Sequence, residues 1–242
     1  MTVDLIWNIM EHIGVIAFAI SGAIVAIDRE TDIFGVVFLS FITAFGGGIM
    51  RDLILSRGIP LFFTRRYLSL IIVCFIAALA VFFFAMIFKK RFIKEEKFLD
   101  SVNNYIDAVG IGAFTVSGAM LAIDLGHVNP FVPILMGMIA CIGGGMLRDI
   151  ILNDVPFVLR KRIYALAAAA GAAVFYVIWY IDHEAKVIAM IVGALTTIVI
   201  RVLATLFKWN MPKAINFTAM RSEEKKAEES EKAENEEKYQ IK

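Results

Sequence analysis

The chain has 242 residues, of which 60% are hydrophobic and 19% charged, and its formal net charge is +1. A mean hydropathy of +0.76 excludes an ordinary soluble domain and predicts a polytopic membrane protein, with membrane lipid as its surroundings. The near-neutral charge gives no reason to expect nucleic-acid binding, and no catalytic, cofactor or metal-ligand motif is present in the sequence, so we expect neither an enzyme nor a resident cofactor or metal.

Seven apolar segments are long enough to cross a bilayer. We place them at residues 8–27, 33–55, 67–88, 105–123, 130–152, 163–181 and 187–207. The first segment has no cationic leader and no cleavage site, so we expect a retained span and not a signal peptide. Pro130 suits the start of a helix, and Cys74 and Cys141 are expected to be inert thiols within apolar spans. The sequence therefore predicts an all-α integral membrane protein with seven transmembrane helices.

The first three spans resemble the next three in sequence. Residues 14–28 align without a gap on residues 110–124 at an offset of 96, and Gly-Gly-Gly-x-x-Arg-Asp follows in both copies at an offset of 97. Because each copy holds an odd number of spans, the second copy must enter the membrane in the opposite sense. We therefore expect two inverted three-helix repeats and an appended seventh helix. Their bounds are 1–94 for the first repeat, 95–104 for a basic linker, 105–182 for the second repeat and 183–210 for the seventh helix.

Basic residues in the loops favour an N-terminus outside the cell and a C-terminus in the cytoplasm. In that orientation the cytoplasmic side holds Arg29, the cations of the linker and the cluster Arg160-Lys161-Arg162, whereas the outside holds Arg57, Arg65, Arg66 and Lys186. Residues 211–242 are rich in Glu and Lys and poor in apolar residues. We expect them to form a charged, disordered cytoplasmic tail of a cell-membrane protein.

Two glycine triplets lie near the middle of the second and fifth spans. They are Gly46, Gly47 and Gly48, and Gly143, Gly144 and Gly145. Each glycine weakens a helix by about 1 kcal/mol, and irregular backbone inside a membrane is tolerated where it lines a cavity. We therefore predict that both helices are broken or kinked at the triplets and line a pathway there. The alternative is that these small residues only let two helices approach closely.

An Arg-Asp sequence follows each triplet, as Arg51-Asp52 and Arg148-Asp149. An unpaired charge at the centre of a membrane helix costs about 3 kcal/mol, and adjacent residues of a helix point about 100° apart. We therefore predict that each Arg faces a carboxylate or a helix C-terminus of another span. Such a pair is either a gate or an architectural ion pair. Replacing Arg51 or Arg148 by Ala would separate a loss of assembly from altered conduction.

Four further residues occupy equivalent positions in the two repeats. Ser21 and Ser117 belong to Ser-Gly-Ala sequences, and Asp28 and Asp124 end the first and fourth spans. The serines either allow close helix packing or line a pathway, and the aspartates either are polar helix ends or form a cation vestibule. We expect Asp107 to cap the N-terminus of the fourth span.

Together these features resemble a known family. Two copies of a three-span unit with Ser-Gly-Ala and Gly-Gly-Gly-x-x-Arg-Asp, followed by one extra span, are similar to the prokaryotic trimeric intracellular cation (TRIC) channels, whose domain is also described as a bacterial glycine transporter domain. The resemblance covers about residues 5–207. It implies a homotrimer with one hourglass pathway in each protomer, kinked at both triplets and permeable to monovalent cations such as potassium. The animal relatives carry a basic residue on the fourth span that is linked to voltage gating. Residues 105–123 contain no Lys or Arg, so voltage sensing by that span is not expected.

The leading hypothesis from the sequence is thus a potassium-permeable channel. The alternative is a secondary transporter for a small zwitterion such as glycine, in which a half-helix N-terminus holds the carboxylate and free carbonyls hold the ammonium. A structural membrane scaffold is a third reading, and it leaves the repeated charges without a use.

Overall fold

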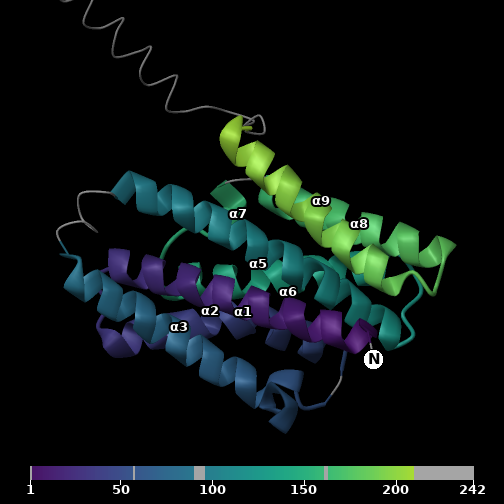
Figure 1. Ribbon diagram of the computed structural model, residues 1–242, viewed down its shortest axis with the longest axis horizontal. Helices are drawn as coiled ribbons and strands as arrows, with labels where there is room; N and C mark the ends of the chain where they lie inside the picture. Colours follow the sequence, from purple (N-terminus) through teal and green to yellow (C-terminus); the bar gives the residue numbers. More distant parts are fainter. Residues whose placement is uncertain (1, 57, 90–95, 161–162, 210–242) are drawn as a thin grey trace, which may run out of the picture. The chain divides into compact units, whose positions relative to one another are not determined.

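The computed structural model describes residues 2–56, 58–89, 96–160 and 163–209, all within the unit Met1–Trp209. Its long helices are α1 (Thr2–Asp28), α2 (Ile33–Ile54), α3 (Leu68–Ile87), α5 (Glu96–Asp124), α6 (Phe131–Ile151), α8 (Ile163–Ile181) and α9 (Lys186–Leu206) (Figure 1). Two 3-10 turns, η1 (Leu61–Phe63) and η2 (Arg65–Tyr67), precede α3, and the short helix α7 (Phe157–Arg160) precedes α8. The predicted tail, 211–242, lies outside the described residues.

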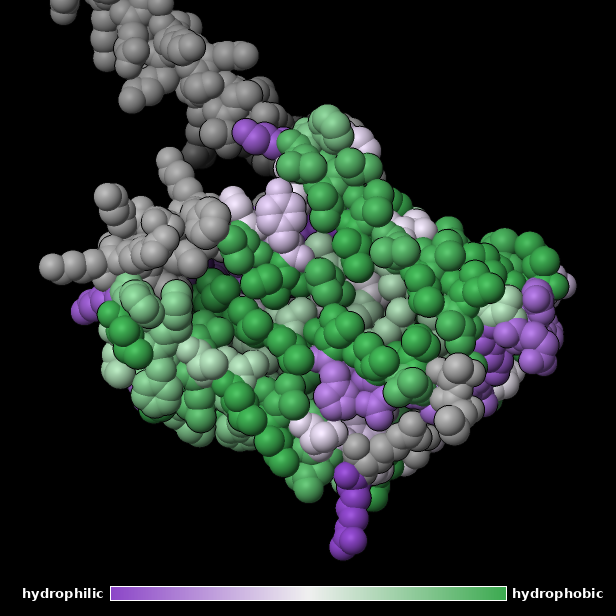
Figure 2. Space-filling view, viewed as in Figure 1, coloured by the Kyte–Doolittle hydropathy of each residue, from purple (hydrophilic) through white to green (hydrophobic). Residues whose placement is uncertain are grey.

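The membrane class predicted from composition is confirmed. Within the described residues, seven helices are long and apolar enough to cross a membrane. Hydrophobic residues dominate the face of the molecule shown in Figure 2, which suits a surface in contact with lipid and not with water. Only 22% of the most apolar window of α3 is buried, so this helix exposes most of its apolar side chains. The protein is therefore a multi-pass membrane protein.

Several helix ends follow from local sequence. The Asp32 carboxylate accepts a hydrogen bond from the Gly35 N–H at 2.8 Å and so caps α2. Helix α6 begins directly after Pro130, as predicted. Helix α5 begins at Glu96, so residues 96–104, which we expected in the basic linker, are helical. Their Glu, Lys and Leu residues are good helix formers, and this lets α5 continue beyond its apolar part.

Helices α2 and α6 run through both glycine triplets as continuous α-helices. The predicted interruption of these helices is therefore wrong, and a bend of the unbroken helices stays a prediction. The glycines instead allow a very close crossing of α2 and α6. A Cβ atom on Gly47 would lie 2.1 Å from the Ala140 carbonyl oxygen, and one on Gly144 would lie 2.0 Å from the Thr43 carbonyl oxygen. Keeping the helices unbroken also satisfies their backbone hydrogen bonds inside the membrane.

The contacts at this crossing demonstrate the inverted repeat. Gly47 meets Ala140, and Thr43 meets Gly144. Gly47 and Gly144 are equivalent positions of the two repeats at the offset of 97, and so are Thr43 and Ala140. The two contacts are therefore the same contact formed twice. Residue numbers rise along one helix as they fall along the other, so α2 and α6 are antiparallel. A twofold pseudo-symmetry that inverts one repeat relative to the other produces this pattern.

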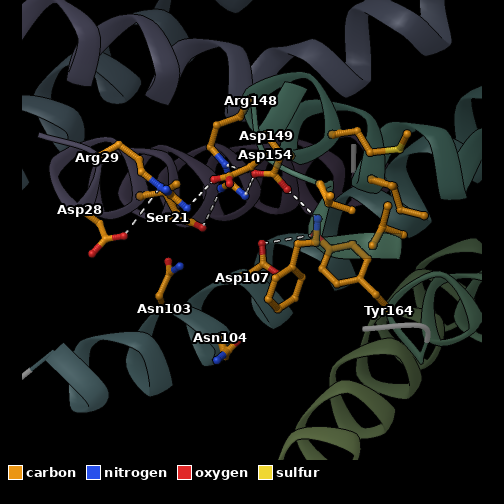
Figure 3. A pocket seen from close by; sticks show the side chains of 17 residues that line it. Ser21, Asp28, Arg29, Asn103, Asn104, Asp107, Arg148, Asp149, Asp154 and Tyr164 are labelled. Atoms are coloured by element: carbon orange, nitrogen blue, oxygen red, sulfur yellow. Dashed lines mark hydrogen bonds and ion pairs between the residues drawn. The ribbon is translucent and has the colours of Figure 1, made fainter. Parts of the chain in front are cut away.

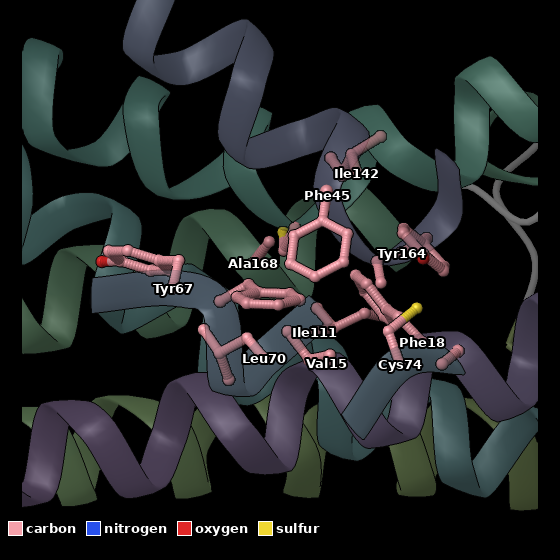
Figure 4. Close-up of a cluster of buried hydrophobic side chains, with 14 residues drawn as sticks. Val15, Phe18, Phe45, Tyr67, Leu70, Cys74, Ile111, Ile142, Tyr164 and Ala168 are labelled. Atoms are coloured by element: carbon pink, nitrogen blue, oxygen red, sulfur yellow. The ribbon is translucent and has the colours of Figure 1, made fainter. Parts of the chain in front are cut away.

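Helices α1 and α5 repeat the same arrangement at an offset of 96. A Cβ atom on Gly14 would touch the Phe114 ring, and one on Gly110 would touch the Phe18 ring. The Phe18 and Phe114 rings contact each other, with centroids 5.2 Å apart, so these two equivalent residues meet at the pseudo-symmetry axis. Both belong to a buried cluster that joins the two repeats (Figure 4). The appended helix α9 packs against α5 and α8 of the second repeat.

Candidate functional site

Each Arg-Asp sequence forms a buried ion pair between its own two residues. Arg51 Nε and Nη2 donate to Asp52 Oδ1 at 2.9 and 2.8 Å. Arg148 Nε and Nη2 donate to Asp149 Oδ1 at the same distances. The sequence predicts that each Arg faces a carboxylate or a helix C-terminus of another span. The hydrogen bonds to a carboxylate lie within the same helix instead, whereas Glu11 and Asp107 of other spans interact with Arg51 and Arg148 electrostatically. The long Arg side chain turns back to its neighbour, and this compensates for the divergent directions of adjacent Cβ atoms.

The second carboxylate oxygen of each Asp fixes the segment that follows the helix. Asp52 Oδ2 accepts a hydrogen bond from the Leu61 N–H at 2.8 Å, at the start of η1. Asp149 Oδ2 accepts one from the Phe157 N–H at 2.7 Å, at the start of α7. Each carboxylate thus binds a guanidinium and a backbone N–H, so both of its oxygens have partners inside the protein. The ion pairs therefore have an architectural part in both repeats.

A polar cavity of about 400 Å³ lies beside Arg148 and Asp149, between the second repeat and α1 of the first repeat. It is lined by residues of α1, of the N-terminal half of α5, of the end of α6 and the connection that follows it, of α7 and of the start of α8 (Figure 3). Its ionisable residues are four aspartates and two arginines: Asp28, Asp107, Asp149, Asp154, Arg29 and Arg148. With all of them ionised, the lining carries a formal charge of minus two.

The first repeat holds a smaller copy of the same site. A pocket of only about 30 Å³ is lined by Glu11, Arg51, Asp52, Tyr67 and Gly48, which are the repeat equivalents of Asp107, Arg148, Asp149, Tyr164 and Gly145 in the large cavity. A further pocket of about 10 Å³ lies beside it. Because the repeats are inverted, these pockets and the large cavity lie on opposite sides of the α2–α6 crossing.

Sequence reasoning missed the two acids at these centres. Glu11 belongs to no sequence motif described above, and Asp107 is predicted from the sequence to cap a helix. Since α5 begins at Glu96, Asp107 lies within the helix, and both acids are less than 10% exposed. Each acid interacts electrostatically with the Arg of its own repeat, Glu11 with Arg51 and Asp107 with Arg148. The offset of 96 that relates residues 14–28 to 110–124 also relates Glu11 to Asp107, and this signal could have found them.

The appended helix adds a third arginine that sequence reasoning also missed. Arg201 is 2% exposed, and its Nη2 lies 3.7 Å from Asp107 Oδ2. Its guanidinium lies over the Tyr164 ring, 4.6 Å from the centroid. Tyr164 in turn donates a hydrogen bond to Asp107 Oδ1 at 3.4 Å. A lone cation within an apolar span is a functional signal in its own right.

The predicted serines and helix-end aspartates lie in different surroundings in the two repeats. Ser21 lines the large cavity and lies 3.5 Å from Arg148 Nη1, whereas Ser117 is buried and donates to the Phe114 carbonyl oxygen. Asp28 lines the mouth of the cavity beside Arg29. Its equivalent, Asp124, is exposed and pairs with Lys186 of α9 at 3.3 Å, and it lines none of the three pockets described above. The structure therefore brings Ser21 and Asp28 into the cavity and leaves Ser117 and Asp124 out of it.

The six glycines of the triplets also divide by position. Gly46, Gly47, Gly143 and Gly144 make the helix crossing, where an added Cβ would lie within 3.0 Å of the facing helix. Gly48 and Gly145 line the pockets, and the nearest atoms to an added Cβ would be 3.8 Å away or more. The alternative that small residues let two helices approach closely therefore holds for the first two glycines of each triplet. Only the third glycine lines a pocket.

These features define a class of protein. It is a multi-pass membrane protein made of two inverted three-helix repeats and a seventh helix, with pockets that hold buried charged residues on both sides of a central helix crossing. The family model described as "Glycine transporter" matches residues 8–86 and 104–180, which are parts of the two repeats. The chain belongs to this family.

Curated relatives agree with this assignment. The UPF0126 membrane protein YvgT of Bacillus subtilis is 34% identical over 206 residues, covering 85% of this chain and 95% of the relative. A UPF0126 membrane protein of Deinococcus radiodurans is 36% identical over 196 residues, covering 79% of this chain and 84% of the relative.

The fold matches solved structures of TRIC channels. One structure, from work on conductance through TRIC cation channels, is 37% identical with a TM-score of 0.74 and covers 86% of this chain and 97% of its own. A prokaryotic TRIC channel crystallised in 0.5 M KCl is 31% identical with a TM-score of 0.76, covering 86% and 99%. The TRIC trimeric intracellular cation channel orthologue from Rhodobacter sphaeroides is 32% identical with a TM-score of 0.73, covering 84% and 98%.

Proposed function

We propose that this protein is a channel for monovalent cations, potassium first among them, with one pathway inside each protomer of a homotrimer. The observation that carries the proposal is the lining of the large cavity, where four aspartates face two arginines. A concave site with an excess of one charge concentrates ions of the opposite charge. The likeness to TRIC cation channels, one of them described as trimeric, supports the same conclusion.

The pathway runs from the large cavity to the small pocket of the first repeat. Between them lie the α2–α6 crossing and the buried cluster that contains Phe18 and Phe114. Apolar constrictions of this kind block ions because water leaves them. The structure described here is then a closed state, and conduction requires that the helices separate around the aromatic cluster.

The large cavity opens toward the cytoplasm in this proposal. Asp28 and Arg29, at its mouth, lie in a connection that the distribution of basic loop residues assigns to the cytoplasmic side. Labelling of single cysteines introduced at Asp28 and at Asp124 with a membrane-impermeant reagent tests this orientation. The proposal requires that only the second position reacts from outside intact cells.

A transporter for a zwitterion such as glycine is the second candidate. It is favoured by one observation, the presence of the Arg148 guanidinium and several carboxylates in a single cavity. The structure removes another argument for it, because the continuous helices α2 and α6 offer no half-helix N-terminus in the membrane to hold a carboxylate.

Reconstitution of the purified protein into liposomes separates the two candidates. A channel gives potassium currents with unitary steps, whereas a transporter gives saturable glycine uptake without them. Asp28→Asn should reduce potassium conductance at low ionic strength, because it removes a charge at the cavity mouth. Asp124→Asn is its matched control at the equivalent position outside the cavity. Glycine uptake by liposomes that pass no potassium would overturn the proposed function.

A further inference from the structure

The two charge centres differ in one buried group, the Arg201 guanidinium on α9. Glu11 interacts electrostatically with one arginine, Arg51 of its own repeat, whereas Asp107 interacts with both Arg201 and Arg148. Helix α9 has no partner in the repeat, so it brings to the second centre a positive charge that the fold symmetry does not require. A charge inside a membrane span is costly, and it is seldom kept without a use.

The contact between Arg201 and Asp107 is loose for a structural ion pair. Guanidinium and carboxylate groups usually form hydrogen bonds of about 2.7–2.9 Å, and the other two arginines do so with their neighbouring aspartates. Arg201 Nη2 is 3.7 Å from Asp107, and its Nε and Nη2 have no hydrogen-bond partner in the part of the chain that the structure describes. The guanidinium is held instead over the Tyr164 ring.

This geometry places Asp107 between two positions for a positive charge. Asp107 and Tyr164 line the large cavity, and Arg201 is not among the lining residues (Figure 3). Arg201 therefore contacts Asp107 from outside the cavity lining, and its Nε and Nη2 form no hydrogen bond with the carboxylate oxygens. A cation that enters the cavity approaches the same carboxylate from the front and is repelled by the guanidinium on the other side.

We propose that Arg201 is a fixed counter-charge that weakens the binding of monovalent cations at Asp107. The inference rests on the proposed function, since it names Asp107 as a cation ligand of the pathway. Arg201 is not a ligand, because its charge acts on the bound cation by repulsion and does not touch it. Because a cation must dissociate quickly to be conducted, a counter-charge of this kind keeps the site from holding its ion.

The test measures potassium binding to purified protein, and it does not depend on transport. A ligand that binds only the folded state raises the unfolding temperature as its concentration increases, so the Kd follows from titrating potassium against N-methyl-D-glucamine at constant ionic strength. Arg201→Gln should tighten the Kd by about tenfold, the effect of one unit charge a few ångströms from the site in a partly hydrated cavity. Arg201→Lys should restore weak binding. Lys208→Gln, which removes an exposed cation just beyond α9, should change nothing.

A second comparison keeps the test valid if Arg201→Gln does not assemble. Asp107→Asn should weaken potassium binding, and the double variant that adds Arg201→Gln should bind more tightly than Asp107→Asn alone. The double variant leaves neither charge unpaired. A Kd that stays the same when Arg201 is removed, in both backgrounds, would overturn the inference, and so would the absence of potassium binding in every variant.

Potassium flux through liposomes of the same proteins separates this inference from the proposed function. If the protein passes potassium but its Kd for potassium does not change when Arg201 is removed, the inference is wrong and the channel function is still supported. A Kd that responds as expected, in a protein that passes no potassium, supports the inference and contradicts the channel function.

Discussion

The two repeats share a charge centre and differ in the space around it. The second repeat surrounds its centre with a cavity of about 400 Å³, whereas the equivalent pocket of the first repeat has about 30 Å³. The contacts at α2–α6 and α1–α5 are nearly symmetric. The side chains that the two copies place around equivalent positions are not.

Aromatic rings fill the first repeat. Phe45 contacts Phe41 and Phe62 with centroids 4.9 and 4.6 Å apart. The equivalent positions of the second repeat hold Ile142, Met138 and Val158, which are aliphatic. One exchange runs the other way, since Phe157 of the second repeat corresponds to Leu61. Two copies of one scaffold can therefore form a closed side and an open side through a few side-chain exchanges.

The largest expected effect concerns the arginines of the two Arg-Asp pairs. Arg51→Gln should destabilise the protein by about 3–5 kcal/mol, because it leaves Asp52 buried without a counter-charge. Arg148→Gln should cost about 2 kcal/mol less, because water in the large cavity reaches Asp149, and it should change potassium conduction instead. Thermal unfolding in detergent, followed by size-exclusion chromatography, measures the first effect. Equal stability losses in the two variants would show that the cavity does not hydrate the second pair.

The next effect concerns the helix crossing. Gly47→Ala should destabilise the protein by about 3 kcal/mol, the upper end for an overpacked site, because its Cβ would meet the Ala140 carbonyl oxygen at 2.1 Å. Gly48→Ala is the matched control, since its nearest contact would be 3.8 Å away, and it should gain up to about 1 kcal/mol of helix propensity. The unfolding temperatures of the two variants give the answer. If Gly48→Ala is the more harmful change, the third glycine acts as a hinge and not as a spacer.

Much of the fold could be predicted from the sequence. Apolar runs of membrane length give the seven spans, and an odd number of spans in each repeat gives their inversion. The glycine triplets were harder to interpret, because two effects compete there. Helix propensity favours a break, whereas close packing and the need to satisfy backbone hydrogen bonds in lipid favour an unbroken helix. At Gly47 and Gly144, close packing and backbone hydrogen bonding prevail over helix propensity. The sequence does not show which helix faces these glycines.

The candidate site was predicted less completely. Arg51-Asp52 and Arg148-Asp149 are buried at the ends of α2 and α6, and their partners depend on side-chain conformations that sequence does not fix. Asp107 was taken for a helix cap because the polar start of α5 hides how far the helix extends. Arg201 carries no motif, and its importance comes from the packing of α9 against α5, which only the structure shows.

A side-chain exchange between the repeats tests whether packing closes the first side. Phe45→Ile combined with Phe62→Val gives the first repeat the residues of the second and should enlarge its pocket, at a cost of about 2 kcal/mol for the lost packing. We expect potassium flux through liposomes to rise several-fold. The reverse exchange, Ile142→Phe with Val158→Phe, should fill the large cavity and lower the flux. Equal flux in both double variants would mean that the constriction lies elsewhere.

The smallest effect concerns the exposed charges at the equivalent helix ends. Lys186 pairs with Asp124 at 3.3 Å, and both side chains are about one-third or more exposed. Lys186→Ala should therefore cost no more than about 0.5 kcal/mol, since exposed ion pairs are screened by solvent. At the mouth of the cavity, Arg29 of the first repeat binds Asp154 of the second repeat. Arg29→Ala should likewise cost little stability but raise potassium flux at low salt, because it leaves the mouth more negative. An equal flux response to both variants would mean that ions do not enter through this cavity, since only Arg29 lies at its mouth.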